Sequence, residues 1–454
     1  MARELRNLTQ VIFLGFLLII ISSAYWSVLQ HEGLLQRKDN PRRVFADQHF
    51  ARGLIVDRHG IALAITSPRA GTTYPQRNYP YPEVVSATGY YSYQYGVDGL
   101  ELAFNDVLVG EWGPSPRAWE VWKNELLSRP SVGADLRSTM DVWLQLAVVD
   151  AFAERSGAAV VVELPSGAIR ALVSLPAVNP NTLDLNWTHL QANHKQQSPL
   201  VNRVLNVSYQ PGSVLQPLIL MAMLNDGYRL EQPIALSQSP IYIDGFTLTC
   251  MQSASDSLTL RDAFILGCPE PFADYDLDPI LFADAGFFES VPLSRIPNAA
   301  YPPIKMRDVK LEALGQGQLT VTPLQMARVT VAIANEGRVP DFYLADAYRM
   351  PSERVWRSLA IPHHTTQLFP LEWVAPMREV MAESAAQMPI EAGVYGHAGV
   401  AYAGHQMLSW YLGFSTESGG LTWVVVVVVE DAQAPYDAVA VAQGAFDYLA
   451  TLEE

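Results

Sequence analysis

The sequence predicts an α/β protein of the α+β type: one antiparallel sheet flanked by helices, preceded by a small domain and one transmembrane helix. Three observations lead to this prediction. An apolar run lies near the N-terminus, strand-like pairs lie at both ends of the residues after 140, and mostly helical sequence separates those pairs. A chain of 454 residues has room for about three domains. We therefore divide it into segments 1–34, 35–139 and 140–454.

The apolar run extends from Val11 to Leu29. About nineteen residues in a helix span about 29 Å, which matches the hydrocarbon core of a bilayer. A cleaved signal peptide would have a shorter apolar core and a small-residue cleavage site. Here Tyr25 and Trp26 instead stand where interfacial aromatic residues do. We predict a membrane anchor over 1–34, although basic residues on both sides of the run leave its orientation open.

Residues 35–139 are expected to form a small, irregular domain. The stretch RGLIVDRHGIALA, residues 52–64, is typical of two short strands around a turn at Arg58-His59-Gly60. Prolines and tyrosines are frequent in the residues that follow, and much of that sequence has no clear periodicity.

Residues 140–454 are expected to hold the main sheet. A helix begins at Asp141, and AAVVVEL and AIRALVS then form a hairpin around Pro165-Ser166-Gly167. Near the C-terminus, SWYLGFS and LTWVVVVVVE form a second strand pair. The run Val424–Val429 has no polar alternation, so we place it mid-sheet with helices on both sides. A helix over 437–452 closes the domain.

Composition excludes some classes of function. The net charge is −16, whereas nucleic-acid binders usually carry a basic surface, so no nucleic-acid partner is predicted. The two cysteines, Cys250 and Cys268, either form one disulfide or stay as free thiols. No cysteine or histidine cluster has the spacing of metal ligands, so we predict no metal and no cofactor.

Several segments, in this order, resemble the class B penicillin-binding proteins, a family of cell-wall transpeptidases that includes the penicillin-binding protein A and FtsI-like members. The segments that carry the resemblance are RGLIVDRHGIALA, GYYSYQYGVDGLE, GAAVVVELPSGAIRALVSLPAVNPN, LVNRVLNVSYQPGSVLQPLIL, ALGQGQLTVTPLQMARVTVAIANEGRVP and GHAGVAYAGHQMLSWYLGF. The resemblance covers nearly the whole chain. It implies a pedestal, or dimerisation-like, domain over 35–139 and a transpeptidase domain of the serine β-lactamase and D,D-peptidase type over 140–454.

The first family motif is Ser-x-x-Lys, in which a lysine one helical turn after the serine takes the proton of the nucleophilic hydroxyl. The matching residues here are Ser213 and Gln216. Glutamine carries no charge and cannot accept a proton near neutral pH. Ser213 therefore occupies the nucleophile position without its base, and the competing interpretation is a plain helix N-cap.

The second motif, Ser-x-Asn, falls on Gly267, Cys268 and Pro269. Glycine lacks the hydroxyl that would relay protons, and proline lacks the side-chain amide and constrains the backbone. An alternative makes Cys268 a replacement nucleophile with His397 as its base. A small, buried apolar cysteine is the more ordinary interpretation.

The third motif, Lys-Thr/Ser-Gly, falls on His397, Ala398 and Gly399. A histidine is charged only part of the time, and alanine has no donor for a substrate carboxylate. By resemblance, the backbone amides of Ser213 and Val400 would form the oxyanion hole. No lysine of the chain has serine three residues before it or Thr-Gly or Ser-Gly after it, and no asparagine has serine two residues before it. The three motifs are therefore absent from the whole sequence.

We predict a catalytically inactive member of the family that acts by binding in a peptidoglycan synthesis or cell-division complex. The resemblance implies a SEDS-type glycosyltransferase as partner, and a peptidoglycan stem peptide is a second candidate ligand. It also implies a single-pass protein of the cell membrane whose body lies outside the cytoplasm. The rival hypothesis is a weakly active, penicillin-binding D,D-transpeptidase that uses Ser213 with another base. A purely structural protein with a closed cleft is the third.

Overall fold

The computed structural model describes residues 2–25, 51–68, 75–110, 132–192, 198–234, 240–243, 245–253, 257–305, 307–351, 353–360, 364–390, 393–416 and 421–452. They belong to two compact units: Met1–Ala51, Ser67–Gln76 and Pro116–Ser131 in the first, and Arg52–Thr66, Arg77–Ser115 and Val132–Glu454 in the second. In the first unit, helix α1 runs from Ala2 to Ala24. None of the described helices is both long and apolar enough to cross a bilayer. The predicted anchor over 1–34 is therefore not confirmed.

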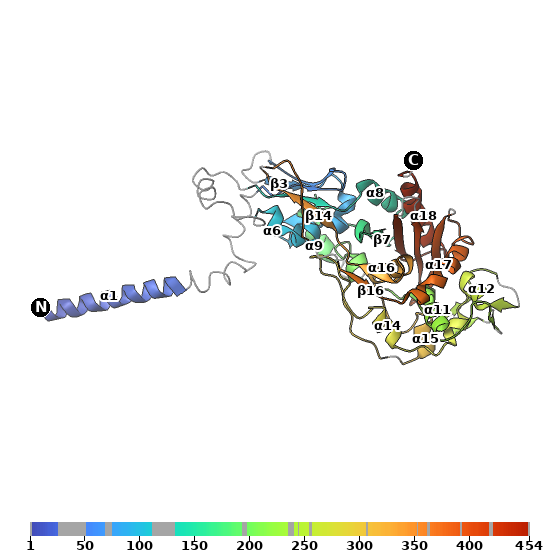
Figure 1. Cartoon of the computed structure of the whole chain (residues 1–454). Helices are drawn as coiled ribbons and strands as arrows, with labels where there is room; N and C mark the ends of the chain where they lie inside the picture. Colours follow the sequence, from blue (N-terminus) through green and yellow to red (C-terminus); the bar gives the residue numbers. More distant parts are fainter. Residues whose placement is uncertain are drawn as a thin grey trace. The chain divides into compact units, whose positions relative to one another are not determined.

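A six-stranded sheet holds the early residues of the second unit, in the order β15-β14-β6-β1-β2-β3. Strands β1 (Ile55–Val56) and β2 (Ala62–Pro68) are antiparallel, which confirms the hairpin predicted over 52–64. Strands β14 (Ala345–Arg349) and β15 (Arg357–Ser358) come from much later in the chain and follow β6 (Asp135–Ser138) in the sheet. In Figure 1, β14 is accordingly orange among blue elements. The sheet thus takes strands from both sides of residue 139.

The remaining elements that accompany this sheet are short. They are β3 (Pro75–Asn78), η2 (Pro82–Val84), α4 (Val85–Thr88), β4 (Tyr91–Ser92), β5 (Gly96–Val97), α5 (Gly99–Ala103) and α6 (Asn105–Leu108).

A second, five-stranded antiparallel sheet has the strand order β17-β18-β19-β7-β8. Strands β7 (Gly157–Leu164) and β8 (Ala168–Leu175) make the predicted hairpin. Strands β18 (Gln406–Thr416) and β19 (Thr422–Val429) make the predicted C-terminal pair, and its connection at 417–420 lies outside the described residues. Strand β17 (Val394–Ala403) forms one edge. Strand β19 is central, as the unbroken valine run predicted.

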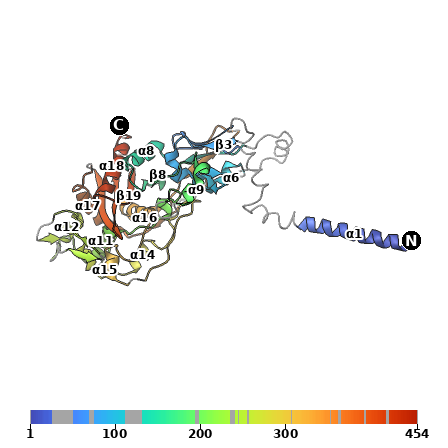
Figure 2. The ribbon, with the colours of Figure 1, turned by 180° about the vertical axis from the view of Figure 1, so that it is seen from behind.

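The two faces of this sheet belong to two different cores. Val424, Val426 and Val428 pack into a core that includes helix α16 (Pro323–Ala334), whereas Val425 and Val427 pack into a core that includes α18 (Asp437–Ala450). Side chains of a strand alternate between faces, so a strand without polar residues needs cover on both sides. Helix α8 (Val142–Ala151) lies beside α18 in both views (Figure 1, Figure 2).

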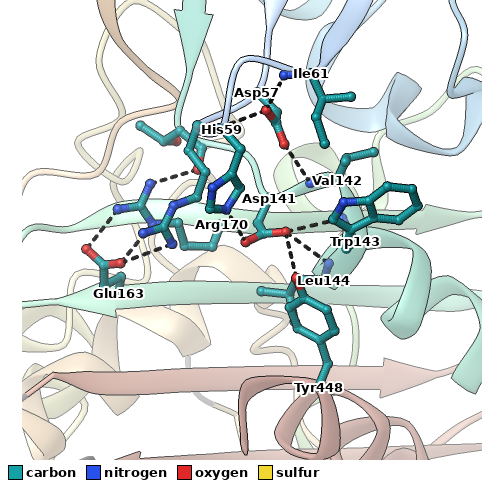
Figure 3. A network of polar contacts seen from close by, with 12 residues as sticks. Asp57, His59, Ile61, Asp141, Val142, Trp143, Leu144, Glu163, Arg170 and Tyr448 are labelled. Atoms are coloured by element: carbon teal, nitrogen blue, oxygen red, sulfur yellow. Dashed lines mark hydrogen bonds and ion pairs between the residues drawn. The ribbon is translucent and has the colours of Figure 1, made fainter. Parts of the chain in front are cut away.

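Helix starts follow from local sequence. In α16, Thr322 and Gln325 form a capping box around a proline in the first turn, so each side chain accepts the other's backbone N–H. In α8, the Asp141 carboxylate accepts the N–H groups of Trp143 and Leu144. Figure 3 shows that the same carboxylate also accepts His59 Nε2 and the Tyr448 hydroxyl, both at 3.2 Å. Asp141 thereby joins the first hairpin, α8 and α18.

The other elements of the second unit lie between β8 and β17. The helices are α9 (Leu183–Ala192), α10 (Arg203–Asn206), η3 (Gly212–Leu215), α11 (Gln216–Asn225), α12 (Leu260–Ile265), α13 (Glu270–Ala273), α14 (Ile280–Asp284), α15 (Val309–Ala313) and α17 (Leu371–Ala385). The strands are β9 (Pro233–Ile234), β10 (Ile241–Ile243), β11 (Phe246–Leu248), β12 (Leu258–Thr259), β13 (Arg338–Pro340) and β16 (Thr365–Gln367).

Candidate functional site

Ser213 lies on the 3-10 turn η3, directly before α11, and this turn packs against β17. The Ser213 hydroxyl accepts the Val400 N–H at 2.9 Å. A Cβ at Gly212 would lie 2.0 Å from the Val400 carbonyl oxygen, and Gly212 has a φ of +57°, so both contact and conformation demand glycine. The Val400 amide, predicted as an oxyanion-hole donor, is therefore bonded to the oxygen at the nucleophile position.

The segment Gly315-Gln316-Gly317 supports this turn from the other side. The Gly212 N–H donates to the Gly315 carbonyl at 2.9 Å, and a Cβ at Gly315 would lie 2.4 Å from the Gly212 oxygen. The buried Glu312 carboxylate accepts the N–H groups of Gln318 and Leu319 at 2.7 and 3.1 Å. The glycines of this motif thus serve backbone packing beside Ser213 rather than chemistry.

Gln216 begins helix α11 and is 2% exposed. Its Nε2 donates to the Cys268 carbonyl at 3.1 Å. Its Oε1 is buried and has no hydrogen-bond partner among the described residues. The family resemblance places a base at this position, but the side chain here is a neutral amide that is hydrogen-bonded to the loop at Cys268.

Gly267, Cys268 and Pro269 follow helix α12 and lead into α13. Cys268 is fully buried and forms a disulfide with Cys250. A disulfide sulfur is neither a thiolate nor a free nucleophile, so the alternative with Cys268 as nucleophile and His397 as base is wrong. Of the two options for the cysteines, the structure has the disulfide.

His397 lies on β17 with its ring 4.3 Å from the Phe264 ring and nearly parallel to it. Its Nε2 faces the Ser213 carbonyl at 3.2 Å and so donates to it, while its Nδ1 is buried without a partner among the described residues. Burial lowers the pKa of His397 to about 4, although the hydrogen bond to Ser213 opposes that shift. The expectation of a part-time charge at this position is therefore corrected: the ring is neutral at neutral pH.

Gly399 brings β17 close to the Ser213 turn. A Cβ there would lie 2.5 Å from the Val214 nitrogen and 3.0 Å from Ser213 Oγ, closer than a side chain tolerates. The preceding Ala398 is buried and contributes only a methyl group to the core around α18. Gly399 thus lets β17 pass close to the Ser213 turn, and Ala398 has no side-chain donor for a substrate carboxylate.

Residues from the first two motif positions meet at one cavity, together with Val400, which directly follows the third. Its lining includes Ser213, Gln216, Gly267, Pro269 and Val400, which the sequence separates widely. The cavity volume is about 10 Å³, which is about the space of one water molecule. The motif positions therefore lie together in the fold, but the cavity between them is too small for a peptide in this conformation.

Apolar residues that sequence reasoning missed fill this cleft. Leu248 of β11, Phe272 of α13 and Leu314 after α15 line the cavity. Phe246 stacks on Tyr402 of β17 at 4.4 Å, so the β10–β11 hairpin packs onto the strand that carries the third motif position. These residues belong to no recognised motif, and their sequence offers no signal beyond apolarity. No group of three His, Cys, Asp or Glu side chains able to hold a metal occurs in the described part of the chain.

Two family models match the chain. Residues 52–136 match the penicillin binding protein A dimerisation domain, and residues 297–449 match the penicillin binding protein transpeptidase domain. Among curated relatives, "Peptidoglycan D,D-transpeptidase PbpA" of Mycolicibacterium smegmatis is 27% identical over 378 residues, which is 77% of this chain and 76% of the relative. The protein of the same name from Mycobacterium tuberculosis is 26% identical over the same shares.

Solved structures show the same fold. Penicillin-binding protein A from M. tuberculosis, as an imipenem acyl-enzyme complex, superposes with a TM-score of 0.77 and 24% identity, covering 89% of this chain and 100% of that one. The D,D-transpeptidase domain of a peptidoglycan glycosyltransferase from Eggerthella lenta gives a TM-score of 0.75 at 24% identity, covering 89% and 99%.

Proposed function

The chain belongs to the class B penicillin-binding protein family, and we propose that it is a non-catalytic member that acts by binding in peptidoglycan synthesis. One observation carries this proposal: the first two motif positions line one cavity and Gly399 of the third packs against Ser213, yet of the three motifs' reactive side chains only the serine is present. The surrounding backbone, with its close glycine contacts, keeps the family's arrangement.

Acyl transfer from a penicillin or a stem peptide needs a nucleophile, a base and a carboxylate anchor that act together. The hydroxyl of Ser213 needs a partner to take its proton, and neither the Gln216 amide nor the neutral His397 ring provides one at its oxygen. Loss of a general base alone lowers rates by about 10²–10⁴-fold. Because such groups contribute as a unit, the losses at the other two positions leave little for a substitute base to restore.

The filled cleft favours a partner protein over a stem peptide as the ligand. A stem peptide would have to displace Leu248 and Leu314 from the cavity, and the Val400 amide from Ser213. The outer surfaces of the pedestal domain need no such change. We propose a SEDS-type glycosyltransferase, or another membrane component of the elongation or division machinery, as the partner.

We further propose that residues 1–34 anchor the protein in the cell membrane and that its body lies outside the cytoplasm. The Cys250–Cys268 disulfide supports the location of the body, because disulfides persist in oxidising compartments and are rare in the cytosol. Protease added to intact spheroplasts should digest the body, and complete protection of the body contradicts this location.

Labelling of the purified protein with a fluorescent penicillin at neutral pH tests the loss of catalysis. We expect no covalent adduct, whereas penicillin-binding protein A of M. tuberculosis, crystallised as a penicillin acyl-enzyme, serves as positive control. We also expect Gln216→Lys alone not to restore labelling, because the loss extends over all three motif positions. Labelling that disappears in Ser213→Ala contradicts the proposal and establishes the weakly active D,D-transpeptidase instead.

A further inference from the structure

A second cavity lies at the far end of the six-stranded sheet, beside β14 and β15. Its volume is about 360 Å³, compared with about 10 Å³ in the filled cleft. Ligand sites commonly measure about 300–1,000 Å³ and combine apolar walls with a few converging polar groups. The walls here include the Trp356 indole and the buried Leu359, and the polar groups include Arg137, Asp346 and Ser358.

The Arg137 guanidinium is held in a fixed orientation at this cavity. Its Nε and Nη2 donate to the two carboxylate oxygens of Asp346 at 2.8 and 3.0 Å. Nearby, Arg349 donates through Nε and Nη2 to Asp135 at 3.2 and 2.7 Å. Both guanidinium groups lie over the Trp356 ring, 5.7 and 4.7 Å from its centroid. Each of the two guanidinium groups is therefore held by its own carboxylate, and both share the Trp356 ring.

The orientation of Arg137 leaves donors for a ligand. A guanidinium has five N–H donors, and the two bonds to Asp346 use only the edge formed by Nε and Nη2. Nη1 makes no hydrogen bond to the described residues. The side chain is 33% exposed and lines the cavity, so a ligand in the cavity can contact this guanidinium. Because the edge formed by Nη1 and Nη2 matches a carboxylate in a two-point contact, a carboxylate is the group that it recognises best.

The neighbouring strand suggests what carries that carboxylate. Among the described strands, β15 is the terminal one of this sheet and pairs only with β14, and both of its residues are exposed. A free strand edge can pair with an extended peptide, while alternate side chains of that peptide enter adjacent pockets. Ser358 belongs to β15 and also lines the cavity. The strand edge and the cavity are thus adjacent parts of one surface.

We propose that this cavity binds an extended acidic peptide, whose backbone pairs with β15 and whose carboxylate contacts Arg137. The Trp356 ring packs against the aliphatic part of the acidic side chain. The site lies on the six-stranded sheet, away from the cleft at Ser213, and the proposal holds whether or not that cleft is catalytic.

Peptide titration of the purified full-length protein tests this proposal. The probe is an N-acetylated, C-amidated heptapeptide with one glutamate among threonine and valine residues, and the comparison peptide has glutamine in its place. We expect the glutamate peptide to bind at least about 10-fold more tightly, a difference of about 1.4 kcal/mol. Equal affinities for the two peptides overturn the proposal.

Arg137→Gln should remove the preference for glutamate over glutamine, because the carboxylate loses its donor. Arg155→Gln is the matched control: Arg155 is 30% exposed and paired with one aspartate, Asp437, at 2.9 Å, away from the cavity. It should leave the preference unchanged. Thermal melting of both variants checks that they fold, and a preference that persists in folded Arg137→Gln contradicts the site.

Ser358→Asp provides a test that leaves the Arg137–Asp346 pair in place. Ser358 is exposed, so the fold should tolerate the change. The carboxylate of the new aspartate should occupy Arg137 and weaken binding of the glutamate peptide at least about 10-fold.

Competition with sodium acetate separates a peptide site from a simple anion site. We expect acetate to compete only at far higher concentration, whereas acetate that matches the peptide's affinity overturns the peptide part of the proposal.

Discussion

Two buried polar centres of this protein differ in whether their acceptor atoms are paired. In the pedestal domain, both carboxylate oxygens of the fully buried Glu101 are bonded, one to Arg52 at 2.9 Å and the other to Arg77 at 2.6 Å, and only the donor Arg77 Nη2 lacks a partner among the described residues. In the cleft, His397 Nδ1 and Gln216 Oε1 are buried without partners among the described residues. The first centre joins segments Arg52–Thr66 and Arg77–Ser115, whereas the second lies where the family's motif positions meet.

Some contacts of the cleft depend on the backbone alone, and others depend on side chains. Gly212, Gly315 and Gly399 allow backbone segments to meet around Ser213, and these contacts need no catalytic group. Polar side chains are different, because a buried polar group is stabilising only when its partner is present. The backbone contacts of the cleft therefore do not depend on paired polar side chains, whereas the centre at Glu101 does.

The largest expected effect comes from Glu101→Ala. Burial alone would raise the pKa of Glu101, but attraction to Arg77 and Arg52 outweighs burial and holds the pKa below its usual range. Removal of one partner from a buried ion pair costs about 3–5 kcal/mol, and here two cations lose theirs. We expect urea unfolding of the soluble body to show a loss in that range.

Asp274→Ala is the control for this change, since it breaks an exposed pair with Lys310 and should leave the unfolding midpoint unchanged. Stability from Glu101 should be complete above about pH 4.3, the pKa of an unfolded glutamate, and should fall as pH drops through its lower folded pKa. A variant as stable as the parent shows that the centre at Glu101 has no special role.

Sequence reasoning predicted the framework because local patterns specify it. The hairpin of β7 and β8 follows from two β-rich runs around a turn, and the central place of β19 follows from its unbroken valines. The contribution of β14 and β15 to the pedestal sheet was not predictable in this way. The pairing of β14 with β6 joins segments more than two hundred residues apart, and neither β14 nor β15 is longer than a few residues.

Sequence reasoning also named the site positions but not their surroundings. The family resemblance placed Ser213, Gln216, Gly267 and Gly399, and the structure brings them together. It did not predict the neutral state of His397, because that depends on burial against Phe264, a contact between distant residues. Nor did it predict that the β10–β11 hairpin fills the cleft, since apolar residues in short strands carry no positional signal.

The buried, neutral ring of His397 should make the stability of the protein depend on pH. Its folded pKa of about 4 lies below the value of 6.5 for a free histidine, so the unfolded state binds a proton at higher pH than the folded state. Stability is complete above about pH 6.5 and falls as pH drops toward 4. The shift corresponds to about 3 kcal/mol at most.

In His397→Leu this part of the pH dependence should disappear. The difference between the unfolding free energies of parent and variant, measured from pH 7 to pH 4, separates the contribution of His397 from that of the other histidines. His405→Asn, which changes an exposed imidazole in the turn between β17 and β18, is the control and should leave the parent's slope unchanged. Identical slopes for the parent and His397→Leu contradict a buried, neutral ring.

The smallest expected effect, and the closest test of the comparison, is Gln216→Leu against Gln325→Leu. Both glutamines are almost fully buried, at 2% and 1% exposure. Gln325 is fully paired: its Oε1 accepts the Thr322 N–H at 2.9 Å, and its Nε2 donates to the Phe287 and Glu289 carbonyls. Gln216 makes one hydrogen bond and buries an unpaired oxygen.

Loss of a paired amide leaves several buried groups without partners, so Gln325→Leu should lower the free energy of unfolding by about 2–4 kcal/mol. In Gln216→Leu, the lost bond to Cys268 is offset by removal of the unpaired oxygen and by new apolar burial, so we expect a change within about 1 kcal/mol. Equal losses in the two variants, measured by urea unfolding, show that Gln216 is fully paired in solution and remove the contrast between cleft and framework.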